Sequence, residues 1–213
     1  EMSASLVGSE MCIRDRYIYF ARPDSVIDGC QVHTARVRAG SFLALEHPVQ
    51  ADVVIGVPDS GLDAALGYSQ ESGIPYGIGF IKNKYIGRTF IQGSQKQREN
   101  SVRIKLNVVS STVKGKRVVL VDDSIVRGTT SRQIVQMLRE AGATEVHFLS
   151  SAPEFLYPCY FGTDVPSNKQ LIASSHSTEE IRQQIGADSL GYMPIEELQN
   201  MVGDLPICRA CFD

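Results

Sequence analysis

The chain has 213 residues, which suits one generous α/β domain and leaves little room for two enzymatic domains. Hydrophobic residues make up 43% and charged residues 21%, and this balance excludes a chain that is disordered throughout or fibrous. The formal net charge of −3 excludes a general electrostatic attraction to nucleic acid, so any bound anion must be held by local groups.

The apolar runs and the N-terminal sequence indicate where the protein works. The longest runs, at residues 53–55 and 118–121, have the length of buried strands and are far too short to span a bilayer. The N-terminus lacks the basic region, apolar stretch and cleavage site of a secretory signal. We therefore expect a cytoplasmic protein that binds neither membrane nor nucleic acid.

The first sixteen residues are predicted to be a tail. They show no sustained helical or strand periodicity and end abruptly against the strand-like run at 17–20. Residues 10–16 also match the translation of a transposon end that is used to prepare sequencing libraries. The hypothesis is that residues 1–16 are a non-native artefact of sequence assembly.

The remaining chain alternates strand and helix signals, which predicts an α/β fold with a doubly wound parallel sheet. A basic segment at 82–103 interrupts the alternation as a long loop of the kind that often carries function. The predicted strands lie at 17–20, 52–57, 75–80, 116–121 and 145–149. The predicted helices lie at 27–46, 62–72, 129–141, 178–185 and 194–202.

The most informative segment follows the strand at 116–121. Asp122 and Asp123 leave that strand at its carboxyl end, where open α/β sheets place their ligands. A turn with Gly128 and three hydroxyl residues then opens a helix, so N–H groups, hydroxyls and the helix dipole would converge on one phosphate. The segment is neither a Walker A loop nor a dinucleotide fingerprint.

Two carboxylates beside a phosphate cradle predict a sugar phosphate. Carboxylates accept hydrogen bonds from vicinal ribose hydroxyls and can orient a divalent cation, while the cradle holds a terminal phosphate. The implied ligand is a ribose 5-phosphate. The plain alternative is that Asp122 and Asp123 are a helix cap and a solvated charge, and the continuation Arg-Gly-Thr-Thr-Ser at 127–131 argues against it.

This segment resembles the phosphoribosyl pyrophosphate (PRPP) signature of type I phosphoribosyltransferases, whose fold is a doubly wound parallel sheet with a flexible lid loop. Residues 17–25, 57–61, 82–91 and 172–176 extend the resemblance to the glutamine PRPP amidotransferase family, in its iron–sulfur-containing branch. The resemblance implies that ammonia displaces pyrophosphate from C1 of PRPP and forms 5-phosphoribosylamine, the first step of purine synthesis. In the full enzymes this ammonia comes from glutamine.

The resemblance also implies roles for matching residues. Lys82, Arg88, Asp122 and Asp123 would be catalytic, and Mg²⁺ would be held by both aspartates with Ser60. The residues implied to bind PRPP are Asp59, Ser60, Gly61, Asp122, Asp123, Ser124, Ile125, Val126, Arg127, Gly128, Thr129, Thr130 and Ser131. The residues implied to line the ammonia path are Asn83, Tyr85 and Ile86. For Lys82 and Arg88 the plain alternative is a solvated basic loop.

Three of the five cysteines could reach one metal. Cys208 and Cys211 form a C-x-x-C pair, and soft thiolates of this kind, together with Cys159, select zinc or an iron–sulfur cluster. In one branch of the family the matching positions ligate a structural 4Fe–4S cluster. Its fourth ligand falls at Ile13 here, and Cys12 lies one residue away inside the suspected artefact. Cys30 is expected to be an ordinary buried thiol.

The resemblance divides the chain into a tail at 1–16 and a phosphoribosyltransferase domain at 17–211 with a C-terminal helical and cluster-binding appendage. The family's N-terminal glutaminase domain is expected to be absent, so this chain would use free ammonia. Feedback inhibition by purine nucleotides and a homo-oligomeric full enzyme are further family expectations.

Two other functions stay open. A PRPP-binding regulator would need a basic face or an added helix-turn-helix to contact DNA, and neither is visible in the sequence. A phosphoribosyltransferase for a nucleobase would have no use for the ammonia-path segment at 83–86.

Overall fold

The computed structural model describes residues 11–12, 14–83, 106–159 and 170–213. Of the predicted site residues, Tyr85, Ile86 and Arg88 lie outside these ranges, as does Ile13. No helix in the described part of the chain is long and apolar enough to cross a membrane.

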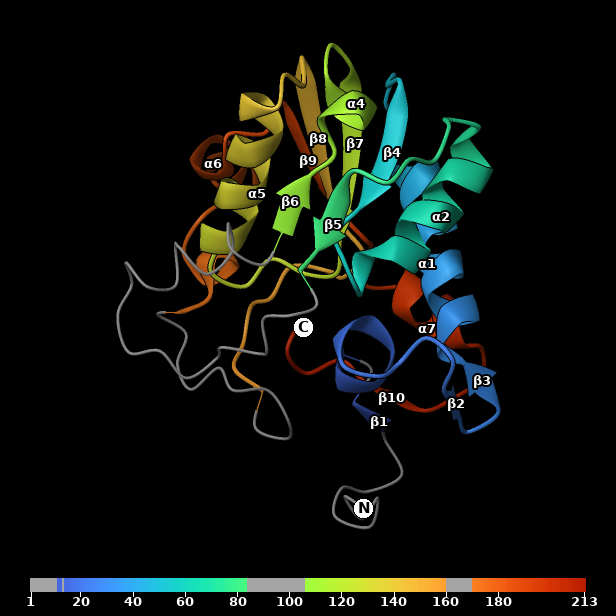
Figure 1. Ribbon diagram of the computed structural model, residues 1–213. Coiled ribbons are helices and arrows are strands. Elements are labelled where there is room, and N and C mark those ends of the chain that lie inside the picture. The colour runs from blue at the N-terminus through green and yellow to red at the C-terminus, as the bar shows by residue number, and fades with distance from the viewer. Residues whose placement is uncertain (1–10, 13, 84–105, 160–169) are drawn as a thin grey trace.

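A four-stranded parallel sheet forms the centre of the molecule (Figure 1). Its strands are, in spatial order, β4 (Val53–Gly56), β7 (Arg117–Asp122), β8 (Glu145–Ser150) and β9 (Ser189–Tyr192). Gly56 lies opposite Val121, and Asp122 lies opposite Ser150, which in turn lies opposite Tyr192. The carboxyl ends of the strands therefore meet at one edge of the sheet.

Helices cover both faces of this sheet, so the predicted doubly wound α/β class is confirmed (Figure 1). On one face, Val119 packs in a core with Leu43, and on the other, Leu120 packs in a core with Ile134. The helices of the first face are α1 (Val32–Glu46), α2 (Gly61–Ser72) and α7 (Glu197–Val202). Those of the second face are α5 (Thr129–Glu140) and α6 (Thr178–Ile185).

Shorter elements surround the sheet. A parallel pair joins β1 (Met11–Cys12) to β10 (Ile207–Cys208), so residues that the sequence placed in a tail pair with the C-terminal region. That residues 1–16 are non-native stays a prediction. The other short elements are the helical segments η1 (Arg14–Tyr19), α4 (Ser110–Val113) and η3 (Ile172–Ser174), and the antiparallel pairs β2 (Val26–Ile27) with β3 (Cys30–Gln31) and β5 (Phe80–Lys82) with β6 (Leu106–Val108).

The N-terminal region differs from the prediction in two places. The run at 17–20 is not a strand, because η1 buries Tyr17 in the core and the Tyr17 hydroxyl donates to the Ile27 carbonyl at 2.7 Å. The helix predicted from residue 27 begins at Val32, because Asp28 (φ +47°) and Gly29 (φ +82°) turn the β2–β3 hairpin with backbone angles that a right-handed helix cannot adopt.

Two further boundaries were predicted too early. The strand predicted at 75–80 begins at Phe80, because only a single bridge, Val54 with Tyr76, joins the preceding residues to the sheet. The helix predicted from residue 194 begins at Glu197.

Helices α1 and α2 cross at two glycines. A Cβ on Gly40 would lie 1.9 Å from the Ala64 carbonyl oxygen, and a Cβ on Gly67 would lie 1.9 Å from the Val37 carbonyl oxygen. Only glycine allows the two backbones to approach so closely. The crossing therefore sets where the N-terminus of α2 lies.

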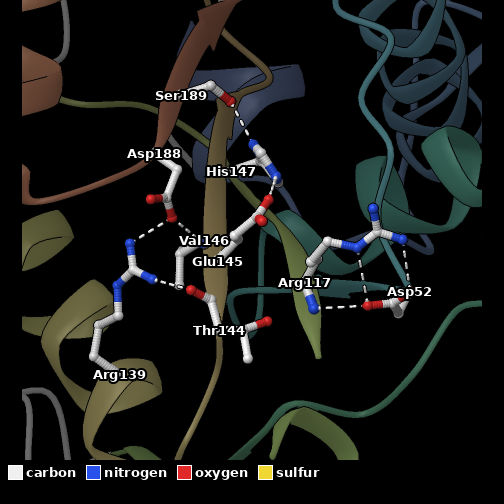
Figure 2. A network of polar contacts seen from close by, with 9 residues as sticks. All are labelled: Asp52, Arg117, Arg139, Thr144, Glu145, Val146, His147, Asp188 and Ser189. Atoms are coloured by element: carbon white, nitrogen blue, oxygen red, sulfur yellow. Dashed lines mark hydrogen bonds and ion pairs between the residues drawn. The ribbon is translucent and has the colours of Figure 1, made fainter. Parts of the chain in front are cut away.

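Ion pairs hold the amino ends of the strands together (Figure 2). Arg117 donates to Asp52 at 2.9 Å, and this hydrogen bond is the main reason that the pKa of Asp52 falls to about 2. Arg139 pairs with Asp188 and donates to the Thr144 carbonyl at 2.7 Å. Exposed pairs of this kind contribute little each, and they lie at the edge opposite the carboxyl ends.

Candidate active site

The carboxyl ends of β4 and β7 bring two predicted segments together. The Val57 N–H donates to the Val121 carbonyl at 2.9 Å, so the chain after β4 continues beside β7. Gly61 lies so close to β7 that a Cβ there would be 2.5 Å from the Val121 oxygen. The Ser60 hydroxyl then donates a short hydrogen bond to Asp123. The structure therefore brings the segment at 59–61 next to the acidic pair.

Asp122 and Asp123 are both buried, with 7% and 8% of their surfaces exposed. The Asp123 N–H donates to Asp122 at 2.9 Å, and the Ser124 hydroxyl donates to Asp123 at 2.6 Å. Burial, and then the charge of Asp123, raise the pKa of Asp122 well above its usual value, although the N–H of Asp123 acts in the opposite direction.

This donor set suits a hard divalent cation. Two carboxylates and the Ser60 hydroxyl offer oxygen ligands only, and these are what Mg²⁺ prefers. A cation bound there would counteract the effects of burial and of the Asp123 charge, which raise the pKa of Asp122.

The loop after Asp123 has the shape of an anion cradle. It ends at Gly128, whose φ of +73° is strained for other residues, and a Cβ there would lie 2.8 Å from the Ile172 side chain. The Ile172 N–H donates to the Val126 carbonyl at 2.9 Å, and this hydrogen bond attaches the loop to η3. The first turn of α5 holds no acidic residue, so its N–H groups and dipole are available to an anion.

Lys82 also reaches this site. It ends β5 and forms an ion pair with Asp59, and both side chains are substantially exposed. The structure therefore brings a predicted catalytic lysine to the predicted pyrophosphate segment. Asn83 follows it within the described chain.

The fold brings segments that carry cysteines near one another, but the described cysteines do not form a metal-binding site. Cys12 lies opposite Cys208, and the Cys211 carbonyl accepts hydrogen bonds from Leu156 and Tyr157 at 3.0 and 3.1 Å. Within the described ranges, no three His, Cys, Asp or Glu side chains are arranged to hold a metal ion. The prediction for Cys30 is wrong: this thiol is only half-buried, since it lies on the β2–β3 hairpin.

Sequence reasoning missed a polar cluster beside the site, formed by the buried Arg36 and the partly exposed His33 and Asp63. Arg36 is 3% exposed. The available signal was its position in α1, because Arg36 falls on the same helical stripe as the buried Val32 and Ala39. An arginine in such a stripe needs partners for its charge.

The fold and this site define a phosphoribosyltransferase, and the comparison with known families agrees. The phosphoribosyl transferase domain family matches residues 35–153, which is more than half of the chain, so the chain belongs to that family. Within it, the chain is similar to amidophosphoribosyltransferases from several organisms.

The similarity is high but covers only part of these relatives. The amidophosphoribosyltransferase of Bacillus subtilis (strain 168) is 58% identical over 202 residues, which is 92% of this chain and 42% of that protein. That of Methanocaldococcus jannaschii is 56% identical over 204 residues, which is 96% of this chain and 43% of that protein. The solved structure of glutamine PRPP amidotransferase from B. subtilis, complexed with ADP and GMP, matches with a TM-score of 0.86 at 55% identity, covering 100% of this chain and 47% of that one. The chain thus spans less than half the length of these relatives.

Proposed function

We propose that this chain is the phosphoribosyltransferase part of an amidophosphoribosyltransferase, forming 5-phosphoribosylamine and pyrophosphate from PRPP and ammonia. The observation that carries the proposal is the hydrogen bond from Ser60 to Asp123. It joins a segment suited to pyrophosphate to carboxylates suited to ribose, and the phosphate cradle follows directly. The amidophosphoribosyltransferase relatives support the choice of reaction.

In this proposal the chain fixes PRPP at both ends. Residues 124–131 would hold the 5-phosphate, and the backbone of 59–61 would donate N–H groups to the pyrophosphate. Asp122 and Asp123 would accept hydrogen bonds from the ribose hydroxyls. Mg²⁺, held by Asp122, Asp123 and Ser60, would supply positive charge to the leaving group.

The reaction then needs positioning and charge more than proton transfer. The ammonia lone pair forms the new N–C1 bond while the electrons of the C1–O bond leave with pyrophosphate. Positive charge develops on the ribose ring, near the carboxylates, and negative charge grows on pyrophosphate. Lys82, which contacts Asp59, would neutralise part of that negative charge.

The full chain, Mg²⁺, PRPP and ammonium chloride test this function together. We expect pyrophosphate release that depends on ammonium. A coupled pyrophosphate assay measures this release, and reactions without ammonium are the control. Release that requires a nucleobase instead would identify a salvage enzyme. Binding of PRPP without any release would favour the regulator.

We also propose that the whole enzyme to which this chain would belong has other properties of the amidophosphoribosyltransferase family. Glutamine would supply the ammonia through a glutaminase domain, and residues 17–211 would form the phosphoribosyltransferase domain. Purine nucleotides would act as feedback inhibitors, which the ADP and GMP in the related structure support. A cytoplasmic homo-oligomer completes the proposal.

A structural 4Fe–4S cluster on Cys159, Cys208 and Cys211 is proposed as well; the family's fourth position falls at Ile13, next to Cys12. The backbone register that sets Cys12 opposite Cys208 supports the cluster, although the described side chains of Cys159, Cys208 and Cys211 do not form a metal-binding group. We expect anaerobic reconstitution to yield equal amounts of bound iron and sulfide, and Cys208→Ser to prevent this while Cys30→Ser does not. Equal iron binding by both variants would contradict the cluster.

A further inference from the structure

Arg36 is a buried cation that the proposed reaction does not use. Its Nε donates to the Tyr17 carbonyl at 2.6 Å, and its Nη2 donates to the Ala21 carbonyl at 2.9 Å. A guanidinium leaves water at high cost unless its donors find acceptors, and these two carbonyls satisfy one side of it. The remaining side faces α2.

The partner on α2 is Asp63, in the first turn of that helix. Nη1 of Arg36 lies 4.0 Å from Oδ2 of Asp63, and Oδ1 of Asp63 lies 3.0 Å from Nδ1 of His33. Oδ2 is buried and has no hydrogen-bond partner in the described structure, so the charge of Arg36 is its main compensation. Moving Asp63 away from Arg36 would leave each of these charges without the opposite charge that compensates it.

This pair is tied to the candidate active site at two points. Asp63 lies three residues beyond Ser60, so the place of the first turn of α2 determines where the Ser60 hydroxyl points. Arg36 also interacts with Asp123: burial lowers the pKa of Arg36, while the charges of Asp63 and Asp123 raise it. The guanidinium therefore lies within electrostatic reach of Asp123, which accepts the hydrogen bond from Ser60.

We propose that Arg36, acting through Asp63, is a positioning residue for the PRPP site. It holds the start of α2 so that the segment at 59–61 stays beside Asp123 and is ready to receive pyrophosphate. The inference rests on the proposed function. A purely structural role for the pair would instead lower stability and leave the use of PRPP by folded protein unchanged.

Two variants of the full chain test this role. Arg36→Lys keeps the charge but loses the planar fork that reaches three partners, and Asp63→Asn keeps the size but loses the charge. We expect each to raise KM for Mg²⁺-bound PRPP about tenfold while kcat changes by less than about twofold, because binding contacts weaken equally in the ground and transition states. The double variant should resemble either single one, since both break the same interaction.

Arg139→Lys is the matched control. Arg139 also donates to a backbone carbonyl and pairs with an aspartate, but it does so at the amino edge of the sheet (Figure 2). Its KM for PRPP should equal that of the wild type. All variants are assayed well below their unfolding temperatures, and Asp63→Asn carries the test if Arg36→Lys does not fold.

The outcomes separate the inference from the proposed function. An unchanged KM in folded Asp63→Asn, or effects of the two changes that simply add, would overturn the positioning role while the wild type still releases pyrophosphate. If the wild type binds PRPP without releasing pyrophosphate, the proposed function fails, and the same comparison is made on Kd for PRPP by calorimetry. A wild type that binds no PRPP overturns both.

Discussion

Replacing Asp123 by Asn is expected to reduce ammonium-dependent pyrophosphate release by roughly 100- to 1000-fold, the range seen when one precisely placed electrostatic group is removed from an active site. Asp123 accepts hydrogen bonds from the hydroxyls of Ser60 and Ser124, so it joins the two halves of the site. An amide is uncharged, and its NH2 group replaces one of the two accepting oxygens, so one of these hydroxyls loses its acceptor. It therefore weakens the cation site and the contact with ribose together. Initial rates at saturating PRPP and Mg²⁺ measure the loss.

Asp188→Asn is a suitable control for Asp123→Asn, because Asp188 forms its ion pair at the opposite edge of the sheet (Figure 2). Its rate of pyrophosphate release should stay within about twofold of the wild type, in line with a surface change away from the site. If Asp123→Asn kept more than about a tenth of the wild-type rate, the assignment of the acidic pair would be wrong.

Replacing Gly40 by Ala is expected to lower the free energy of unfolding by roughly 2–4 kcal/mol, at or above the upper end of overpacking effects. The added Cβ would lie 1.9 Å from the Ala64 oxygen and 2.7 Å from the Tyr68 nitrogen. These are backbone atoms, which no rotamer change can move away. Helices α1 and α2 must then separate, and the segment at 59–61 moves with α2. Urea denaturation followed by circular dichroism measures the loss.

Leu45→Ala provides the comparison for Gly40→Ala on the same helix. Leu45 is 65% exposed, so its replacement should change the free energy of unfolding by less than about 0.5 kcal/mol. Equal midpoints for Gly40→Ala and the wild type would show that the two helices are not packed as closely as described.

Elements with a strong local signal were predicted almost residue by residue. The helix predicted at 178–185 is α6 (Thr178–Ile185), and Ser177 and Glu180 form a capping box that fixes where it starts. β7 follows its continuous apolar run closely. In both cases the residues that decide the structure lie within one turn or one strand of each other.

Elements that depend on distant partners were predicted poorly. The run at 17–20 has strand composition, yet residues 17–19 belong to η1 and residue 20 follows it. The reason is that Tyr17 is buried in the core, where its hydroxyl donates to the Ile27 carbonyl and its own carbonyl accepts from Arg36. The hairpin turn at Asp28 uses a left-handed backbone angle that aspartate adopts only in a suitable context. Tertiary packing overrides local propensity in such places.

The sequence by itself predicted the kind of ligand that we propose for this protein, because Asp122, Asp123 and the cradle up to Ser131 are contiguous and their chemistry is local. Only the tertiary structure decided how the rest of the site is assembled. Ser60 reaches Asp123 across 63 positions because the central sheet aligns the ends of β4 and β7. Lys82, at the end of β5 in a separate two-stranded sheet, reaches Asp59 across 23 positions. The burial of Arg36 beside the site follows from the packing of α1 on α2, and no local pattern encodes that contact.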